Sequence, residues 1–242
     1  EVVVRLQPDG RVTDVLGGSG SAPGLFDGPA DIDPTNGLTL VVADAGNSRV
    51  QRFSKALRLL EVIPVDRTST GRLPSYDRRR AATTSPSNGR PVAVAMTSAD
   101  ELVIVDADQH VVLKWEQNRR AQRVIGGYEE GTGTLIEPFA LALGPSDELW
   151  VADRGHDAVL RYDAFGSFLH MMARGTIDRA QTIAMMGSNL WVIHPDRILV
   201  FNRRGTLQRV YEVRLGEPIV DVARHGRTHY LLTPARLLRW NR

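Results

Sequence analysis

Short apolar runs and polar turns alternate along the whole chain. The runs are rich in Val, Ile, Leu and aromatic side chains, and turn-forming groups such as Pro8-Asp9-Gly10, Asn36-Gly37 and Arg204-Gly205 separate them. Short runs of this composition, bounded by Gly, Pro, Asn and Asp, are typical of β-strands. The pattern therefore predicts an all-β protein.

The runs recur in a fixed order, which identifies an internal repeat. In each copy a first run usually opens at a proline, a second run ends at a polar residue, and a third run closes on an aromatic residue. The first runs begin at Pro29, Pro91, Pro138, Gln181 and Pro218. The second runs end at Asp44, Asp106, Asp153, His194 and Thr233. The third runs close at Phe53, Trp115, Tyr162, Phe201 and Trp240.

A fourth run follows the aromatic residue in four copies. We expect these outer strands at Leu57–Ile63, Ala121–Ile125, Ser167–Met172 and Thr206–Val213. The polar landmarks lie roughly 40 to 60 residues apart, near the period of about 40 to 50 residues that propeller blades show. A single four-stranded antiparallel unit cannot bury both faces, so such units stack around a common axis. The sequence predicts a β-propeller with five visible blades.

The side-chain types within each copy agree with blades that converge on an axis. The first runs carry small residues, such as Ala93, Ala95 and Ala140, where neighbouring strands leave little room. We expect the aromatic residue of each third strand to pack between blades. The basic residue before each aromatic should alternate to the outside. These basic residues are Arg52, Lys114, Arg161 and Arg239.

The repeat resembles the NHL-repeat β-propeller family over nearly the whole chain. The first copy matches best, with Gly17-Gly18, Phe26, Pro29, Val42-Ala43-Asp44, Asn47, Arg49-Val50 and Phe53. The third copy repeats the pattern with Gly126-Gly127, Pro138, Val151-Ala152-Asp153 and His156. The fourth and fifth copies depart from it, because His194 and Thr233 replace the aspartate. The resemblance implies the fold, whereas propellers host binding proteins, lyases and lactonases alike.

The chain start aligns with the second half of a blade. Val2–Leu6 matches a third strand and Arg11–Leu16 a fourth strand, so we expect this hairpin to belong to a sixth blade whose beginning is absent here. The alternative is a five-bladed ring that Arg11–Leu16 closes. Either arrangement makes residues 1–242 a single NHL-like domain with a loop insertion at about 66–90.

Composition narrows the possible functions. The 242 residues carry 30 Lys plus Arg against 28 Asp plus Glu, so the net charge is only +2, which argues against wholesale polyanion binding. The chain contains no cysteine, which excludes disulfides, thiolate metal sites and a cysteine nucleophile. Its apolar runs are far shorter than the about 18 residues of a membrane-spanning helix, so we predict no membrane span.

The first residue is Glu1, and it leads directly into Val2, Val3 and Val4. We interpret this start as a cut or processed end, because no signal peptide is visible in it. Bacterial proteins that resemble this chain are often secreted. We therefore expect a periplasmic or extracellular location, with a cytoplasmic location as the alternative.

The insertion at 66–90 should emerge on the same face as the turns between second and third strands. A loop of this length is either functional or mobile, and its arginines could grip an acidic partner or a phosphate. We expect a protein or peptide partner on this face. The candidate partner-binding residues are Arg78, Arg79, Arg80, Tyr76, Tyr128, Arg154, His156 and His194.

Catalytic and metal-binding interpretations are less favoured. The pair Asp44 and Asn47, echoed by Asp153 and His156, is better explained by side chains that cap backbone amides in a turn. A zinc site could assemble across the channel from His156 and His194, as in propeller lyases that cleave peptidyl hydroxyglycine. The first strands offer Asp31, Asp33 and Asp221, which are too few oxygen ligands for a hard cation without help from loops. We assign no catalytic residue, metal ligand or cofactor.

The sequence favours a non-catalytic binding or scaffold propeller that docks a protein, peptide or glycan on its loop face. The first alternative is a metal-dependent lyase or lactone hydrolase that uses the channel mouth. The second alternative is single-stranded RNA binding. We rank nucleic acid last, because the arginines are spread over every blade and the acidic pair Glu129-Glu130 shares the expected face.

Overall fold

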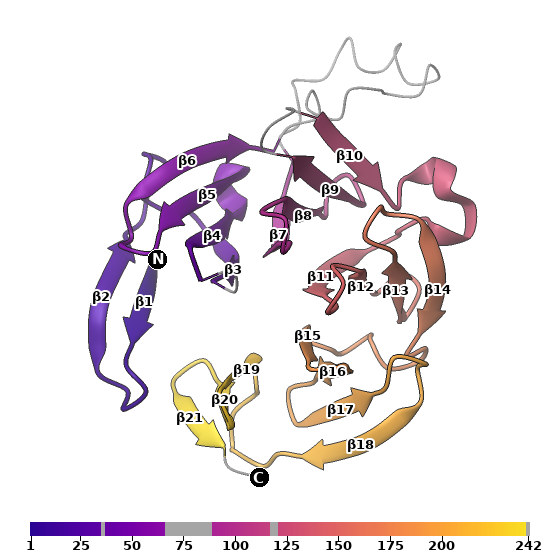
Figure 1. Ribbon diagram of the computed structural model, residues 1–242. Helices are drawn as coiled ribbons and strands as arrows, with labels where there is room; N and C mark the ends of the chain where they lie inside the picture. The colour runs from indigo at the N-terminus through magenta and orange to yellow at the C-terminus, as the bar shows by residue number, and fades with distance from the viewer. Residues whose placement is uncertain (35–36, 66–88, 117–120, 241–242) are drawn as a thin grey trace. The chain divides into compact units, whose positions relative to one another are not determined.

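Antiparallel β-sheets dominate the computed structural model, which describes residues 1–34, 37–65, 89–116 and 121–240 (Figure 1). Within these residues the only helical segments are two short 3-10 turns, η1 (Ala45–Asn47) and η2 (Tyr128–Gly133). The chain divides into two units, Glu1–Gly127 and Tyr128–Arg242. The predicted all-β class is confirmed.

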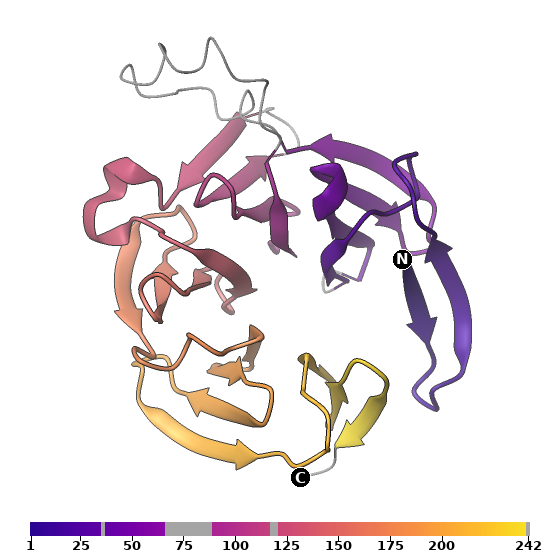
Figure 2. The same ribbon diagram turned by 180° about the vertical axis from the view of Figure 1, so that it is seen from behind.

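The first unit contains a hairpin and two four-stranded sheets (Figures 1 and 2). The hairpin pairs β1 (Val2–Leu6) with β2 (Val12–Gly17). The first sheet contains β3 (Pro29–Asp33), β4 (Thr39–Asp44), β5 (Arg49–Ser54) and β6 (Leu59–Pro64). The second sheet contains β7 (Pro91–Met96), β8 (Leu102–Asp106), β9 (Val111–Glu116) and β10 (Ala121–Ile125). Each sheet is a meander in which strands adjacent in sequence are hydrogen-bonded.

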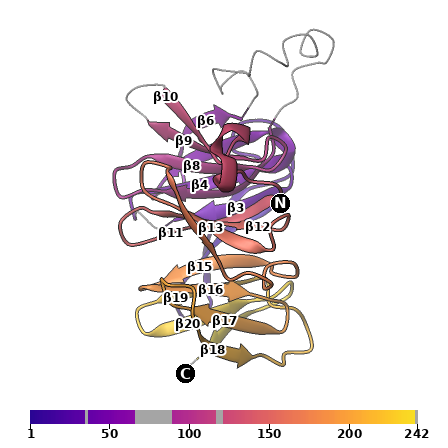
Figure 3. The ribbon, with the colours of Figure 1, turned by 90° about the vertical axis from the view of Figure 1, so that its right-hand side faces the viewer.

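The second unit contains two four-stranded sheets and one three-stranded sheet. The third sheet contains β11 (Pro138–Leu143), β12 (Leu149–Asp153), β13 (Ala158–Tyr162) and β14 (Phe168–Met172). The fourth sheet contains β15 (Thr182–Met186), β16 (Asn189–Ile193), β17 (Arg197–Phe201) and β18 (Leu207–Glu212). The fifth sheet contains β19 (Asp221–His225), β20 (Thr228–Leu232) and β21 (Leu237–Trp240). Figure 3 shows β15 between β11 and β19, so the first strands of successive sheets lie side by side.

The predicted strands agree closely with the observed ones. The expected outer strand at Ala121–Ile125 coincides with β10, and the other three differ from β6, β14 and β18 by one or two residues at their ends. The expected hairpin is present as β1 and β2. Its membership of a sixth blade stays a prediction. Residues 66–88 of the expected insertion lie outside the described residues, and the N–H of Gly89 donates to the carbonyl of Val65 at 2.7 Å.

Four of the five aromatic residues of the third strands pack against a neighbouring sheet or hairpin, as predicted, whereas Tyr162 contacts Phe168 of its own sheet and donates to the carbonyl of Gly133. Phe53, Tyr162 and Phe201 are buried, whereas Trp115 and Trp240 are half-buried against apolar clusters. One cluster combines Trp150 of β12 with Phe201 of β17 and therefore joins the third and fourth sheets. Burial of apolar area between sheets is the main favourable contribution to this packing.

The prediction that the preceding basic residues face outward is wrong for Arg52 and Lys114. Both are buried and paired with carboxylates of the turn between β7 and β8. Arg52 of the first sheet lies 2.6 Å from Asp100 of the second sheet, and Lys114 lies 2.7 Å from Glu101. A long basic side chain can thus cover apolar surface with its stem and still reach an acid.

Glu148 forms the corresponding contact in the second unit. It is buried and accepts hydrogen bonds from Arg161 of its own sheet and from Arg203 of the fourth sheet. Burial alone would raise the pKa of Glu148. The backbone N–H of Ser146, that of Glu148 itself and the charges of Arg203 and Arg161 outweigh burial, so the pKa lies below its usual value.

Two carboxylates of β3 join the first and second sheets. The N–H of Val94 donates to Asp31 at 2.9 Å, and the N–H of Met96 donates to Asp33 at 2.6 Å. These donors belong to β7, whose other edge pairs with β8. Without the carboxylates, both N–H groups would lack a partner on this edge, which is unfavourable in a buried strand.

We predict that Asp33→Ala destabilises the protein by about 1–3 kcal/mol, because it leaves the buried N–H of Met96 without its acceptor. Asp33→Asn should cost less, since the amide oxygen still accepts. Urea unfolding of the full chain measures both effects. Ile32→Ala, at an exposed position of the same strand, is the matched control. Equal stability of Asp33→Ala and Asp33→Asn would contradict the assignment.

Candidate functional site

A buried carboxylate ends the second strand of each of the first three sheets. Asp44, Asp106 and Asp153 are fully buried, and each accepts a backbone N–H from the segment that precedes its own first strand. The donors are Asp27, Arg90 and Ile136, at 2.7, 3.1 and 2.7 Å. These carboxylates fix loops to strand ends.

The same carboxylates also order the turns that follow them. The side chain of Asn47 donates to Asp44 at 2.9 Å, and the N–H of His156 donates to Asp153 at 3.0 Å. The Nε2 of His156 lies 2.8 Å from the carbonyl of Thr134, so this nitrogen is the donor. The bond from the N–H of His156 supports the capping interpretation for Asp153, whereas Asp44 does not cap its turn and instead accepts from the side chain of Asn47. The imidazole of His156 lies toward the loop of its own sheet.

His194 occupies the carboxylate position of the fourth sheet. Its residue is only 3% exposed, and its Nε2 atom has no hydrogen-bond partner within the described part of the chain. Burial, followed by the positive charge of Arg197, lowers the pKa of His194. A hydrogen bond with the backbone of Thr176 and the charge of Asp196 oppose this shift only partly. The imidazole is therefore favoured in its neutral form.

We call residues His194–Arg197 the His194 turn. Two backbone segments flank it. On one side the N–H groups of Val213 and Ile219 donate to the carbonyls of Asp196 and Pro195, both at 2.8 Å. On the other side the N–H of Gln181 donates to the carbonyl of Ile193 at 2.7 Å. The His194 turn thus lies between loop 173–181 and loop 213–219.

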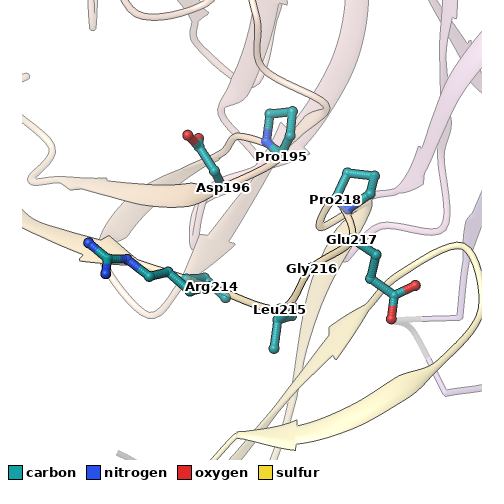
Figure 4. Close-up of a pocket in the computed structure, with 8 residues that line it drawn as sticks. Pro195, Asp196, Arg214, Leu215, Gly216, Glu217 and Pro218 are labelled. Carbon is teal, nitrogen blue, oxygen red and sulfur yellow. The ribbon is translucent and has the colours of Figure 1, made fainter.

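An open pocket of about 430 Å³ lies between the His194 turn and loop 213–219 (Figure 4). Its lining combines apolar and charged side chains, namely Pro195, Asp196, Val213, Arg214, Leu215, Gly216, Glu217 and Pro218. Glu217 pairs with Arg236, whereas Asp196 and Arg214 are exposed. A pocket of this size accepts one or two side chains or a small ligand.

Arg154 is held beside loop 173–181. Its guanidinium lies 3.6 Å from the centroid of the Phe139 ring, and it donates to the carbonyl of Ala180 at 3.3 Å. Stacking on an aromatic ring fixes the plane of a guanidinium and leaves its remaining N–H groups available. Arg154 therefore presents an oriented cationic group at this loop.

The structure brings together only part of the predicted site. Arg154 and His194 both lie beside loop 173–181, whereas His156 points to its own loop. Tyr128 belongs to η2, but its side chain is not among those described. The remaining predicted residues, Tyr76, Arg78, Arg79 and Arg80, lie outside the described residues.

The repeat pattern did not identify Arg179, Arg197 or the pocket residues as candidates. Their positions in the repeat could have predicted that they share a face. Segments between a fourth strand and the next first strand emerge on the same face as the turns between second and third strands. Loop 173–181, loop 213–219 and the His194 turn all satisfy that rule. Their mutual contacts depend on the register between sheets, which the sequence does not show.

Metal ligands are not grouped in the described ranges. Among those residues no three His, Asp or Glu side chains lie close enough together to hold a metal ion. No helix in the described ranges is long and apolar enough to span a bilayer.

We predict that His194 makes stability depend on pH. The folded chain keeps the imidazole neutral, while the unfolded chain takes up a proton below its ordinary pKa of 6.5, so stability falls as pH falls through this value. His194→Gln should reduce the loss of stability between about pH 7.5 and about pH 5.5. Urea unfolding at both pH values measures it.

His170 is the matched control, because burial and the charge of Arg161 lower its pKa too, in the same direction. His170→Gln should remove only its own share of the pH dependence. If His194→Gln and the wild type lose equal stability on acidification, the buried neutral imidazole is not the cause.

No family model matches the chain, and no curated protein matches it either. Solved structures do resemble it. A catalytically inactive variant of virginiamycin B lyase from Staphylococcus aureus, solved with quinupristin, has a TM-score of 0.63 and 11% identity, covering 99% of this chain and 77% of that one.

Two further structures show the same likeness. A streptogramin B lyase has a TM-score of 0.61 and 12% identity, covering 91% of this chain and 70% of that one. Hydrazine synthase of Kuenenia stuttgartiensis has a TM-score of 0.61 and 14% identity, covering 86% of this chain and 56% of that one. Identities this low establish the fold alone. The chain is a β-propeller.

Proposed function

We propose that the protein is a binding module that docks a protein, peptide or glycan partner on its loop face. In the second unit this face comprises residues 154–157, 173–181, 194–197, 213–220 and 233–236. One observation carries the proposal: hydrogen bonds of Asp153, Asp157, Thr233 and the backbone hold these loops in place, while an open pocket and exposed arginines are presented beside the His194 turn.

The loop face of the second unit is ordered before any partner binds. Asp157 accepts the N–H groups of Ile177 and Asp178 at 2.7 and 2.9 Å, and Arg236 pairs with Glu217. Loops fixed by such contacts lose little conformational freedom when they bind. Preformed concave surfaces with a few polar groups are typical of binding sites. This supports recognition of a partner by a rigid scaffold.

We further propose that the chain is an NHL-repeat propeller with six blades, in which β1 and β2 are the third and fourth strands of a blade. The repeated motif and the packing of Val3 and Leu16 against the cluster of Phe26 and Phe53 support this. The proposal that the protein acts in the periplasm or outside the cell rests on the family resemblance.

A pocket variant tests partner binding. The full chain is immobilised, proteins from an extract of its source cells are identified by mass spectrometry, and the affinity of the purified partner is then measured. Leu215→Asp in the pocket should weaken binding at least about tenfold, because it places an unpaired charge on an apolar contact. Val210→Asp, at an exposed position of β18, is the matched control and should change affinity little.

Circular dichroism confirms that both variants keep the fold. If a partner binds the wild type, Leu215→Asp and Val210→Asp with equal affinity, the pocket is not its docking site. If the wild type retains no protein, peptide or glycan, the binding function itself is wrong.

A lyase is the second candidate. It is supported by the likeness to a virginiamycin B lyase whose inactive variant carries a histidine-to-alanine replacement, and by the buried Nε2 of His194, which has no partner among the described residues. An elimination needs a group that accepts a proton, and a neutral imidazole can do so. The alternative of lactone hydrolysis at the channel mouth requires the same kind of base.

Incubation with quinupristin distinguishes this second candidate. Ring opening by elimination leaves the mass unchanged but alters retention in chromatography, whereas hydrolysis adds one water. If the protein is such an enzyme, product forms with the wild type and falls at least about a hundredfold with His194→Ala. Quinupristin that stays intact with the wild type, with or without added divalent cations, would remove a lyase of this substrate class.

A further inference from the structure

We propose that Arg179 and Arg197, on either side of His194, form a subsite for a carboxylate of a peptide ligand. The carboxylate belongs to an acidic side chain or to the C-terminus, and a neighbouring apolar side chain of the same peptide enters the pocket beside the His194 turn. This inference rests on the proposed binding function and names the chemistry of its partner.

Backbone contacts bring the two arginines to one place. Arg179 precedes Ala180, whose carbonyl accepts a hydrogen bond from Arg154, and the next residue, Gln181, donates to Ile193 at the end of β16. Arg197 opens β17, and its carbonyl accepts the N–H of His194 at 2.8 Å. The two arginines therefore approach the His194 turn from loop 173–181 and from β17.

Both arginines lie near enough to His194 for their charges to act on its imidazole. The charges of Arg197 and Arg179 each lower the pKa of His194, after the larger effect of burial, and only the charge of Asp196 opposes them. Arg179 is exposed and Arg197 is half-buried. Neither forms a side-chain hydrogen bond or ion pair with any described residue. Their N–H groups are available to an anion.

A third arginine lies beside loop 173–181, because Arg154 stacks on Phe139 and donates to the carbonyl of Ala180. Guanidinium groups bind carboxylates with charge-assisted, often bidentate hydrogen bonds. The Nε2 of His194 is a buried polar atom without a described partner, which proteins rarely leave so.

The lining of the pocket indicates which side chain of the peptide lies next to the carboxylate. Pro195 and Asp196 line it and lie directly between His194 and Arg197, so pocket and arginines share one turn. Its apolar wall, formed by Pro195, Leu215 and Pro218, suits an aliphatic or aromatic side chain. Glu217 pairs with Arg236, and the single charge of Asp196 stands against those of Arg197 and Arg214. A peptide with an apolar residue near a carboxylate satisfies both features.

Selection from a peptide library tests the subsite. The full chain is presented with phage that display random octapeptides, and a selected peptide is resynthesised with a fluorescent label. We expect enrichment of Asp or Glu close to an apolar residue. The double variant Arg179→Ala/Arg197→Ala should weaken binding of that peptide at least about tenfold by fluorescence anisotropy, because two charge-assisted contacts are lost.

A charge-matched double variant provides the control. Arg204→Ala/Arg209→Ala removes two exposed arginines that lie outside the loop face, one in the turn between β17 and β18 and one on β18, and should change affinity less than about twofold. Replacing the acidic residue of the peptide by its amide should weaken binding to the wild type and have little further effect on Arg179→Ala/Arg197→Ala.

The outcomes separate the subsite from the proposed function. If the wild type selects no peptide, both are contradicted for peptide partners. If it selects peptides without acidic residues, or if both double variants bind equally, the subsite is wrong and the binding function stands. If inorganic phosphate displaces the peptide where sodium chloride of equal ionic strength does not, the site is a phosphate site and the carboxylate assignment is overturned.

Discussion

The loops of this protein depend on one interaction, a buried carboxylate that accepts backbone N–H groups from a loop of its own sheet. Asp44, Asp106 and Asp153 each occupy the end of a second strand and connect it to the segment before the first strand. Unpaired buried N–H groups and unpaired buried carboxylates are both unfavourable, so each satisfies the other. In the first three sheets, the residues that lead directly into the first strand are thereby fixed to the end of the second strand.

The fourth and fifth sheets solve the same problem with other groups. Thr233 closes its turn through the N–H of Arg236 at 2.9 Å, and His194 contacts the backbone of Thr176 but leaves Nε2 without a partner in the described chain. The departure from the repeated carboxylate therefore coincides with the pocket and with unpaired arginines. The candidate ligand site therefore lies where His194 replaces the structural carboxylate.

Much of the fold could be predicted because strands and blades have short periods. Alternation of apolar residues located the strands, and the recurring aromatics located the contacts between sheets. The salt bridge of Arg52 with Asp100 could not be predicted, because the two residues are 48 positions apart and meet only through the register of neighbouring sheets. The candidate site could be predicted only in part for the same reason, because its contacts also depend on the register of neighbouring sheets. His194 was identified as the polar end of a second run and Arg154 as a candidate partner-binding residue, whereas the roles of Arg179 and Arg197 follow only from the backbone contacts of the His194 turn.

The hydrogen bond between Val65 and Gly89 has a consequence for how the chain can vary. It joins the two sides of residues 66–88, and the bonds of Asp31 and Asp33 with β7 tie together the sheets on either side. Because hydrogen bonds hold the two ends of this segment together, the entropic cost of closing it increases only slowly with the number of residues in it. The segment between Val65 and Gly89 can therefore gain or lose residues, or accept an inserted sequence, during evolution while the two sheets keep their alignment.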